Sequence, residues 1–356
     1  MKINNDPKLD FDDVLLVPQR SRTASRSDIK LVRNFSFYHS DQNWEGIPIF
    51  AANMDTTGSL AMSHALAKHD MPTCLHKHYE LDSLVHELNN TNTQWYSLGI
   101  KKSEIDKLLE FIERSAIVPN LCIDVANGYT DDFVKFCNDV RDKILNRTGM
   151  IPVIMAGNVC TPEMVQELIL HGGVDIVKIG IGPGSACTTR LKTGVGFPQL
   201  SAIIECSHAA HGLRNGDGRL GLVCADGGCR NSADICKAFA AGADFVMLGG
   251  MLAGVEECEG DWDYIQVSHG CVKTRLKFYG MSSHVAQNKY GGIKNYRASE
   301  GRVKTVPYKG SASLVVKDIL GGLRSACAYI GATSLKDMSK CAEFNIVNRT
   351  HFDQSM

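Results

Sequence analysis

The feature that most limits the fold of this chain is a sequence unit that recurs eight times along its 356 residues. Each unit begins with a short apolar run that ends in small or polar residues, and a segment of helical composition follows. Apolar runs with so few polar interruptions indicate parallel strands that helices cover on both faces. The eight runs span residues 48–55, 72–77, 95–99, 121–128, 153–158, 174–180, 222–228 and 245–250.

Eight strand–helix units are the number that closes a (β/α)8 TIM barrel, and a doubly wound open sheet is the main alternative. The ends of the runs favour the barrel, because there they would surround one mouth, where the active sites of this fold lie. We therefore predict an α/β protein with a single barrel domain over residues 1–356. The small, polar or charged residues at or just beyond these ends are Asn53, Asp55, Lys77, Asp124, Asn127, Asn158, Cys187, Asp226 and Gly250.

Two segments break this rhythm, residues 184–198 after the sixth run and residues 278–309 after the eighth. Long irregular stretches in compact domains are usually functional or mobile. We interpret the first as a loop that presents a reactive cysteine and the second as a lid over the mouth of the barrel. A surface excursion without a role is the alternative for the second segment.

The overall charge of the chain excludes some classes of partner. The formal net charge is −1, which gives no electrostatic basis for binding nucleic acid or an anionic membrane. No apolar run is long enough to span a membrane, and the first residues lack the apolar segment of a secretory signal. We expect a cytoplasmic protein whose thirteen scattered cysteines are reduced.

One of these cysteines, Cys187, lies in the glycine-rich loop that follows the sixth apolar run. Thr188, Thr189 and Arg190 place hydroxyl groups and a cation beside it. Most free cysteines are small buried hydrophobes, and this is the alternative for Cys187. A polar glycine loop is an unusual place for a core cysteine, and it favours a reactive thiol.

Two Gly-Gly pairs follow the last two runs, at Gly227-Gly228 and Gly249-Gly250. Loops at these places in barrels often bind phosphate, because they expose backbone N–H groups. Tight turns are the alternative. Asp226 is placed to bind a ribose hydroxyl group. The glycines around Pro183 do not fit a dinucleotide-binding loop, because the spacing differs and no apolar helix follows.

Together these parts suit covalent catalysis on a nucleotide, with a thiolate that attacks an electrophilic ring carbon. A carboxylate and a hydroxyl group would move the protons, and the segment after the eighth run offers Glu300 together with Arg297.

Several longer motifs make the interpretation more specific. They are the cysteine loop, Asp226–Cys229, Met247–Met251, Tyr279–Ser283 and Tyr296–Gly301. In this order the motifs resemble the IMP dehydrogenase/GMP reductase family, over nearly the whole chain from about Leu9 to Asn348. Residues 79–123 are too few to hold the pair of CBS domains that typical dehydrogenases of the family carry. The residues of the last two motifs resemble those of the reductase branch.

The resemblance implies an NADPH-dependent reductive deamination of GMP to IMP and ammonia. Cys187 would attack C2 of guanine and form a thioimidate, and Thr189 and Glu300 match the positions that relay protons to the departing amine. The nucleotide-binding positions that the resemblance implies are Ser185, Asp226, Gly227, Gly228, Gly249, Gly250, Gly280, Met281, Ser282, Arg297, Ala298, Ser299 and Gly301.

The resemblance also implies a potassium ion, held by backbone oxygens of Gly182, Gly184, Cys187 and Arg190, and a homotetramer. A neighbouring subunit would complete the cofactor site, with Arg26 as a partner for the 2′-phosphate. The implied cofactor positions are Lys77, Asp124, Val125, Ala126, Ile181, Gly182, Met281, Tyr296 and Arg297, and, from the neighbouring subunit, Ser25, Arg26, Ser325, Ala326, Cys327 and Ala328.

Two alternatives remain at this point. The first is an IMP dehydrogenase without CBS domains, which would share the cysteine and the thioimidate. The second is a barrel that binds purine nucleotides without turnover. The joint presence of Cys187, Thr189 and Glu300 argues against the second.

Overall fold

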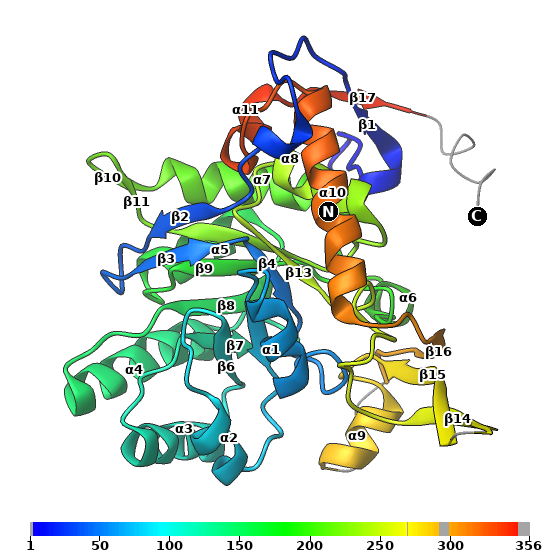
Figure 1. Ribbon diagram of the computed structural model, residues 1–356. Helices are drawn as coiled ribbons and strands as arrows, with labels where there is room; N and C mark the ends of the chain where they lie inside the picture. Colours follow the sequence, from blue (N-terminus) through cyan, green and yellow to red (C-terminus); the bar gives the residue numbers. More distant parts are fainter. Residues whose placement is uncertain (1–2, 269, 292–298, 348–356) are drawn as a thin grey trace.

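Eight parallel strands close into one barrel in the computed structural model, which describes residues 3–268, 270–291 and 299–347 (Figure 1). Each strand overlaps one of the eight predicted apolar runs, so the prediction of a (β/α)8 barrel is confirmed and the open sheet is excluded. Around the ring the strands are β12 (Leu222–Asp226), β13 (Phe245–Leu248), β4 (Ile49–Ala51), β5 (Thr73–Leu75), β6 (Gln94–Leu98), β7 (Leu121–Asp124), β8 (Ile154–Val159) and β9 (Ile176–Ile179).

Helices follow the strands and cover the outside of the barrel. Their sequences show why they start and stop. α4 begins where the Thr130 hydroxyl group accepts the N–H of Phe133, and it ends at Gly149 in the left-handed conformation. The covering helices are α1 (Leu60–Ala67), α2 (Leu81–Glu87), α3 (Lys102–Ser115), α4 (Asp131–Thr148), α5 (Pro162–Leu170), α7 (Gln199–Gly212), α8 (Ser232–Ala240) and α10 (Ala312–Tyr329).

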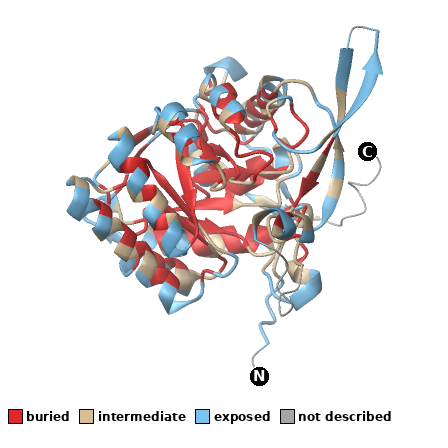
Figure 2. Cartoon of the chain, turned by 90° about the horizontal axis from the view of Figure 1, so that it is seen from below, coloured by how far each residue is buried: buried red, intermediate tan, exposed pale blue. Residues whose placement is uncertain are grey.

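The inside of the barrel is a packed core of side chains from alternate strand positions. The barrel strands are accordingly coloured as buried in Figure 2. Phe50 and Trp95 meet there edge to face with ring centroids 5.0 Å apart. Alternation is a property of every strand, so residues two positions apart point to the same side. In β7, for example, Cys122 belongs to this inner cluster while Ile123 packs outward against the helices.

A hairpin of β2 (Arg33–Ser36) and β3 (Asn43–Gly46) closes the end of the barrel where the strands begin. Its Phe35 ring lies 4.5 Å from Phe245, the first residue of β13. The cavity that the Gly-rich loops line is at the opposite end, at the carboxyl ends of the strands. Two short pairs, β1 (Val14–Leu16) with β17 (Phe344–Ile346) and β10 (Arg214–Asn215) with β11 (Gly218–Arg219), and helix α11 (Met338–Cys341) lie outside the barrel.

The two segments that break the sequence rhythm are more ordered than their composition indicates. Residues 184–198 contain the short helix α6 (Thr189–Thr193). Residues 278–309 contain the end of β15 (Gly270–Tyr279), helix α9 (His284–Tyr290) and β16 (Val303–Pro307). β15 pairs with β14 (Trp262–Val267) and β16 in a separate sheet, and β14 and the first half of β15 project from the barrel as an exposed ribbon (Figure 2). None of the described helices is long and apolar enough to cross a membrane.

Candidate active site

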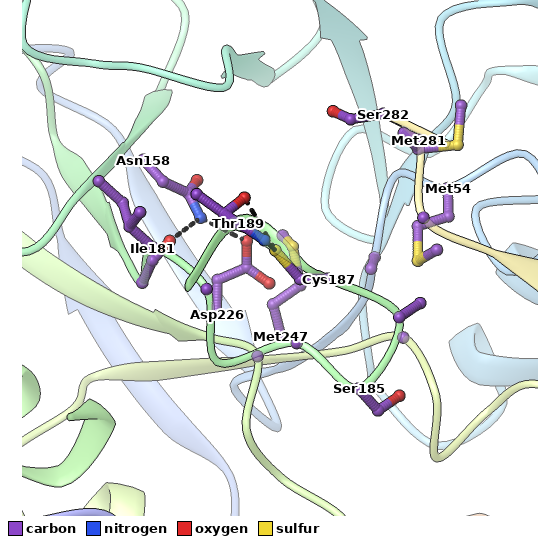
Figure 3. A pocket seen from close by; sticks show the side chains of 18 of the residues that line it. Met54, Asn158, Ile181, Ser185, Cys187, Thr189, Asp226, Met247, Met281 and Ser282 are labelled. Atoms are coloured by element: carbon purple, nitrogen blue, oxygen red, sulfur yellow. Dashed lines mark hydrogen bonds between the residues drawn. The ribbon is translucent and has the colours of Figure 1, made fainter. Parts of the chain in front are cut away.

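A cavity of about 270 Å³ lies at the carboxyl ends of the barrel strands (Figure 3). Three groups of residues enclose it. The floor is formed by Asp124, Lys178 and Asp226 at the ends of β7, β9 and β12. The wall is the cysteine loop, residues 180–189. The roof comprises residues 280–282 and 299–302 together with α9, and Met281, Ser282 and Glu300 bring it into the cavity lining.

Cys187, Thr189 and Glu300 form a continuous hydrogen-bonded chain in this cavity. The Cys187 thiol donates to Thr189 Oγ1 at 3.2 Å, and the Thr189 hydroxyl group donates to Glu300 Oε2 at 2.7 Å. Cys187 is partly exposed to the cavity, and it is not a core residue. A thiol, a hydroxyl group and a carboxylate in series provide a nucleophile and a route for a proton. The structure thus brings together the three residues that the sequence predicts to act together, and their joint action stays a prediction.

Backbone hydrogen bonds hold the wall and the roof together at this point. The N–H of Thr188 donates to the carbonyl of Glu300 at 2.9 Å, and the N–H of Arg302 donates to the carbonyl of Ala186 at 2.7 Å. Cys187 and Gly301 form an isolated antiparallel bridge. Cys187 and Glu300 therefore lie on two adjacent backbone segments, although 113 positions separate them in a chain of 356.

The two Gly-Gly pairs line the side of the cavity next to the wall. Gly227 and Gly228 have φ values of 86° and 89°, a backbone conformation that favours glycine. Gly250 approaches Ser185 so closely that a Cβ atom would lie 2.8 Å from the Ser185 hydroxyl oxygen. Backbone donors and a serine hydroxyl group together suit a phosphate group.

Lys178 is the buried centre of the floor. Its ammonium group lies 2.8 Å from Asp124 Oδ1 and 2.9 Å from Asp226 Oδ2, and its side chain is 2% exposed. Burial alone would lower the pKa of Lys178, but the two carboxylates outweigh it and raise the pKa above its usual value. Asn53 donates to Asp124 at 3.1 Å, and Asn158 donates to Asp226 at 2.9 Å.

The roof is attached to the barrel through one carboxylate, Asp55, which follows β4 and is 3% exposed. The hydroxyl groups of Tyr279 and Tyr290 donate to its Oδ2 at 2.7 and 2.8 Å, and the Lys289 ammonium group donates at 3.1 Å. Burial raises the pKa of both tyrosines, so they remain donors. Tyr290 also stacks on His78 with ring centroids 3.4 Å apart.

Most of the predicted nucleotide-binding residues line this one cavity. Ser299 and Gly301 belong to the roof but do not contribute to the lining, and Arg297 and Ala298 lie outside the described residues. The residues of this predicted set that line the cavity are Ser185, Asp226, Gly227, Gly228, Gly249, Gly250, Gly280, Met281 and Ser282.

The predicted cofactor residues divide into two groups. Asp124, Val125, Ala126, Ile181, Gly182 and Met281 line the cavity, and Lys77 lies just outside it, 2.8 Å from Glu104. Tyr296 and Arg297 lie outside the described residues. The remaining positions do not line the cavity of their own chain, and Arg26 instead lies over the Tyr329 ring at 5.9 Å. This second group is Ser25, Arg26, Ser325, Ala326, Cys327 and Ala328.

The predicted potassium ligands are close together in the cysteine loop. Gly182 lies against Arg190, and a Cβ atom on Gly182 would come within 2.5 Å of Arg190 Cγ. This contact brings the two backbone segments that carry the proposed carbonyl ligands next to each other. Carbonyl oxygens are hard ligands, so the donor set fits an alkali cation. Within the described part of the chain, no group of three or more histidine, cysteine or acidic side chains could hold another kind of metal ion.

Sequence reasoning missed Lys178, Met54 and Met247 as parts of the cavity. A signal for Lys178 exists, since it is the only cation in the apolar run 174–180. A charged residue in a strand buried on both faces requires partners. The methionines carry no comparable signal, because methionine also fills ordinary cores.

Comparisons with known proteins agree with this site. A family profile described as the IMP dehydrogenase/GMP reductase domain matches residues 8–355. The chain belongs to the IMP dehydrogenase/GMP reductase family. It is 48% identical to a protein named GMP reductase from Aeromonas salmonicida over 350 residues, which cover 97% of this chain and 96% of the relative. It is 49% identical to human GMP reductase 1 over 357 residues, 98% of each chain, and 50% identical to human GMP reductase 2 over 348 residues, 96% of this chain and 95% of the relative.

Proposed function

We propose that this protein reduces GMP with NADPH to give IMP, NADP⁺ and ammonia. The observation that carries the proposal is the hydrogen-bonded chain from Cys187 through Thr189 to Glu300 in a cavity with a phosphate-binding character. Relatives about 48–50% identical over almost the full length carry the name GMP reductase.

The chemistry begins when the Cys187 thiol passes its proton through Thr189 to Glu300 and becomes a thiolate. It adds to C2 of guanine, and the amino group leaves as ammonia after it has received a proton, so that a thioimidate joins C2 to the sulfur. Ammonia leaves only when an acid is close to it, and the Thr189 hydroxyl group supplies the proton and regains one from Glu300. The bound NADPH supplies a hydride for C2. The thiolate of Cys187 then leaves as IMP forms, which suits a sulfur that is a stable anion.

The floor and the glycine turns orient the nucleotide for this attack. Asp226 binds the ribose hydroxyl groups, and the Gly-Gly turns with Ser185 bind the phosphate. The cavity residues from Asp124 to Ala126, with Lys77 nearby, hold the reduced cofactor against the opposite side of the base. The loop from Gly182 to Arg190 holds a potassium ion, which fixes the turn that carries the cysteine.

The same proposal includes a cytoplasmic homotetramer. In it, Ser25, Arg26 and residues 325–328 of a neighbouring subunit complete the cofactor site. The placement of these residues away from their own chain's cavity is what such an arrangement requires.

An absorbance assay tests the proposal. Purified protein with GMP and NADPH should consume the reduced cofactor and release ammonia in equal amounts. The variant Cys187→Ala should still bind GMP but lose turnover by at least about 10⁴-fold, because no covalent intermediate forms.

A matched control is Cys229→Ala, since Cys229 also lines the cavity but has no contact with Thr189. It should keep turnover. Activity only with IMP and NAD⁺ would identify a dehydrogenase instead. Binding of purine nucleotides without turnover in either direction would identify a nucleotide-binding barrel.

A further inference from the structure

Lys178 has no part in the proposed chemistry, yet it is one of the most deeply buried charged groups in the described structure. It points into the barrel from the residue before the last of β9, between two carboxylates that come from different strands. A buried charge is costly unless it is paired, and an unneeded one could be replaced by an apolar side chain. This position therefore calls for an explanation.

The strand register explains how one lysine reaches both carboxylates. Asp124 of β7 is the register partner of Gly157 in β8, and Gly157 is the partner of Lys178 in β9. Gly157 has no side chain, and a Cβ atom there would lie 2.6 Å from Lys178 Cβ. The empty position lets the lysine side chain pass over β8 to Asp124. On the other side, β12 brings Asp226 within reach.

The two carboxylates face different parts of the same cavity. Asp226 uses Oδ2 for both Lys178 and Asn158, and its Oδ1 has no hydrogen bond to any described residue. That oxygen is available to a ligand (Figure 3). Asp124 lies beside Val125 and Ala126, in the part of the cavity assigned to the cofactor.

The balance of charges around Lys178 also favours a role that involves both carboxylates. The ammonium group and the two carboxylates sum to −1, so removal of the lysine would leave two negative charges near each other in the barrel. The other groups that face Lys178 are the Met247 thioether, 3.7 Å from the ammonium nitrogen, and thiols, which the apolar interior keeps neutral where the pKa is raised, as for Cys74 and Cys224. The titratable groups around the ammonium are Asp124, Asp226, Cys74, Cys122 and Cys224.

We propose that Lys178 is a positioning residue that ties the nucleotide-side carboxylate Asp226 to the cofactor-side carboxylate Asp124, so that one buried cation orients both ligands. The inference rests on the proposed function, because that function assigns the two carboxylates to GMP and to the dinucleotide. The lysine touches neither ligand and acts through the two aspartates.

The test measures binding of GMP alone and of NADP⁺ alone by calorimetry, so that it does not depend on turnover. Lys178→Met should weaken both ligands by roughly tenfold, the loss expected when a charge-assisted hydrogen bond that orients an acceptor is removed. Lys178→Arg keeps the charge and should restore most of both affinities. Lys178→Gln is a second neutral variant, expected to weaken both ligands, in case the methionine variant does not fold.

Two further measurements separate positioning from a general loss of structure. In the Asp226→Asn background, Lys178→Met should weaken GMP no further but should still weaken NADP⁺, because only the Asp124 arm is left. The affinity of the Lys178→Met variant for GMP should also fall as the pH drops toward 6, since two neighbouring carboxylates without a cation take up a proton more readily.

Unchanged affinities in both neutral variants, or losses that add fully to those of Asp226→Asn, would overturn the proposal. A wild-type chain that binds both ligands without turnover would contradict the proposed function alone. A wild-type chain that binds neither would overturn both.

Discussion

The floor and the roof of the cavity are built in different ways. The floor residues Asp124, Lys178 and Asp226 come from barrel strands, whose backbone pairing fixes their places before any side chain makes a contact. The roof is attached to the barrel by side chains that meet at Asp55 and by a short backbone bridge to the cysteine loop. A floor of this kind should be rigid and a roof of this kind easier to move, which suits a site that must admit two ligands.

The largest effect should come from cutting the link between the wall and the roof. Thr189→Val removes the hydroxyl group between Cys187 and Glu300 but keeps the shape of the side chain. Turnover should fall by about 10²–10⁴-fold, the usual contribution of a proton-transfer group. The KM for GMP should change little, and steady-state kinetics would measure both.

The neighbouring threonine provides a matched control. The Thr188 hydroxyl group is buried and has no hydrogen-bond partner among the described residues. Thr188→Val should therefore keep near wild-type turnover. Equal losses in the two variants would show that the relay through Thr189 does not exist.

A smaller effect should come from weakening the attachment of the roof. Asp55→Asn removes the negative charge that accepts hydrogen bonds from Tyr279, Tyr290 and Lys289. We expect kcat/KM to fall by about tenfold, equal to the loss of one charge-assisted hydrogen bond. Hydrogen exchange should become faster in α9 and stay unchanged in β7, β9 and β12.

Lys289→Met is the control for this variant. The Lys289 side chain is 48% exposed, and exposed ion pairs contribute little. Its effect should be much smaller than that of Asp55→Asn. Faster exchange in the barrel strands of Asp55→Asn would mean that the roof and the floor are not separate units.

The smallest effect should be a loss of roof stability at acid pH that depends on His78. Burial, followed by the nearby positive charges of His76 and Lys77, lowers the pKa of His78 to about 4. Because the folded pKa lies below the unfolded value near 6.5, the neutral ring stabilises the roof above pH 6.5. This stability is lost as the pH falls from 6.5 through 4.

His78→Phe keeps an aromatic ring against Tyr290 but cannot take up a proton. The protection factors of its α9 amide groups should fall less between pH 6.5 and 4 than those of the wild type. Identical pH profiles in the two proteins would assign the acid sensitivity of the roof to other groups.

The barrel could be predicted from the sequence because its signal is local. Each strand is an apolar run, and each run ends in residues whose chemistry differs from the core, as at Asp124 and Asp226. The sequence also indicated that Cys187 lies outside the core, since a cysteine among glycines is unusual, and the structure places it in the cavity lining. These features require no knowledge of what lies far away in the chain.

The rest depends on contacts between distant segments. The role of Lys178 depends on its contacts with Asp124, 54 positions before it, and Asp226, 48 positions after it. The attachment of α9 depends on Asp55, more than 220 residues earlier. The segment 278–309 was expected to be irregular because glycine and charge obscure the alternation of β16, which is visible only once β16 pairs with β15.

The bridge between Cys187 and Gly301 has one more consequence, for the order of events in a catalytic cycle. In the proposed mechanism, a roof that separated from the cysteine loop would carry Glu300 away from Thr189. The same backbone contact would therefore both hold the roof over the cavity and complete the hydrogen-bonded chain from Cys187 to Glu300. With the roof away from the cysteine loop, Cys187 would lack its proton relay. Ligands would then enter before the reaction could start.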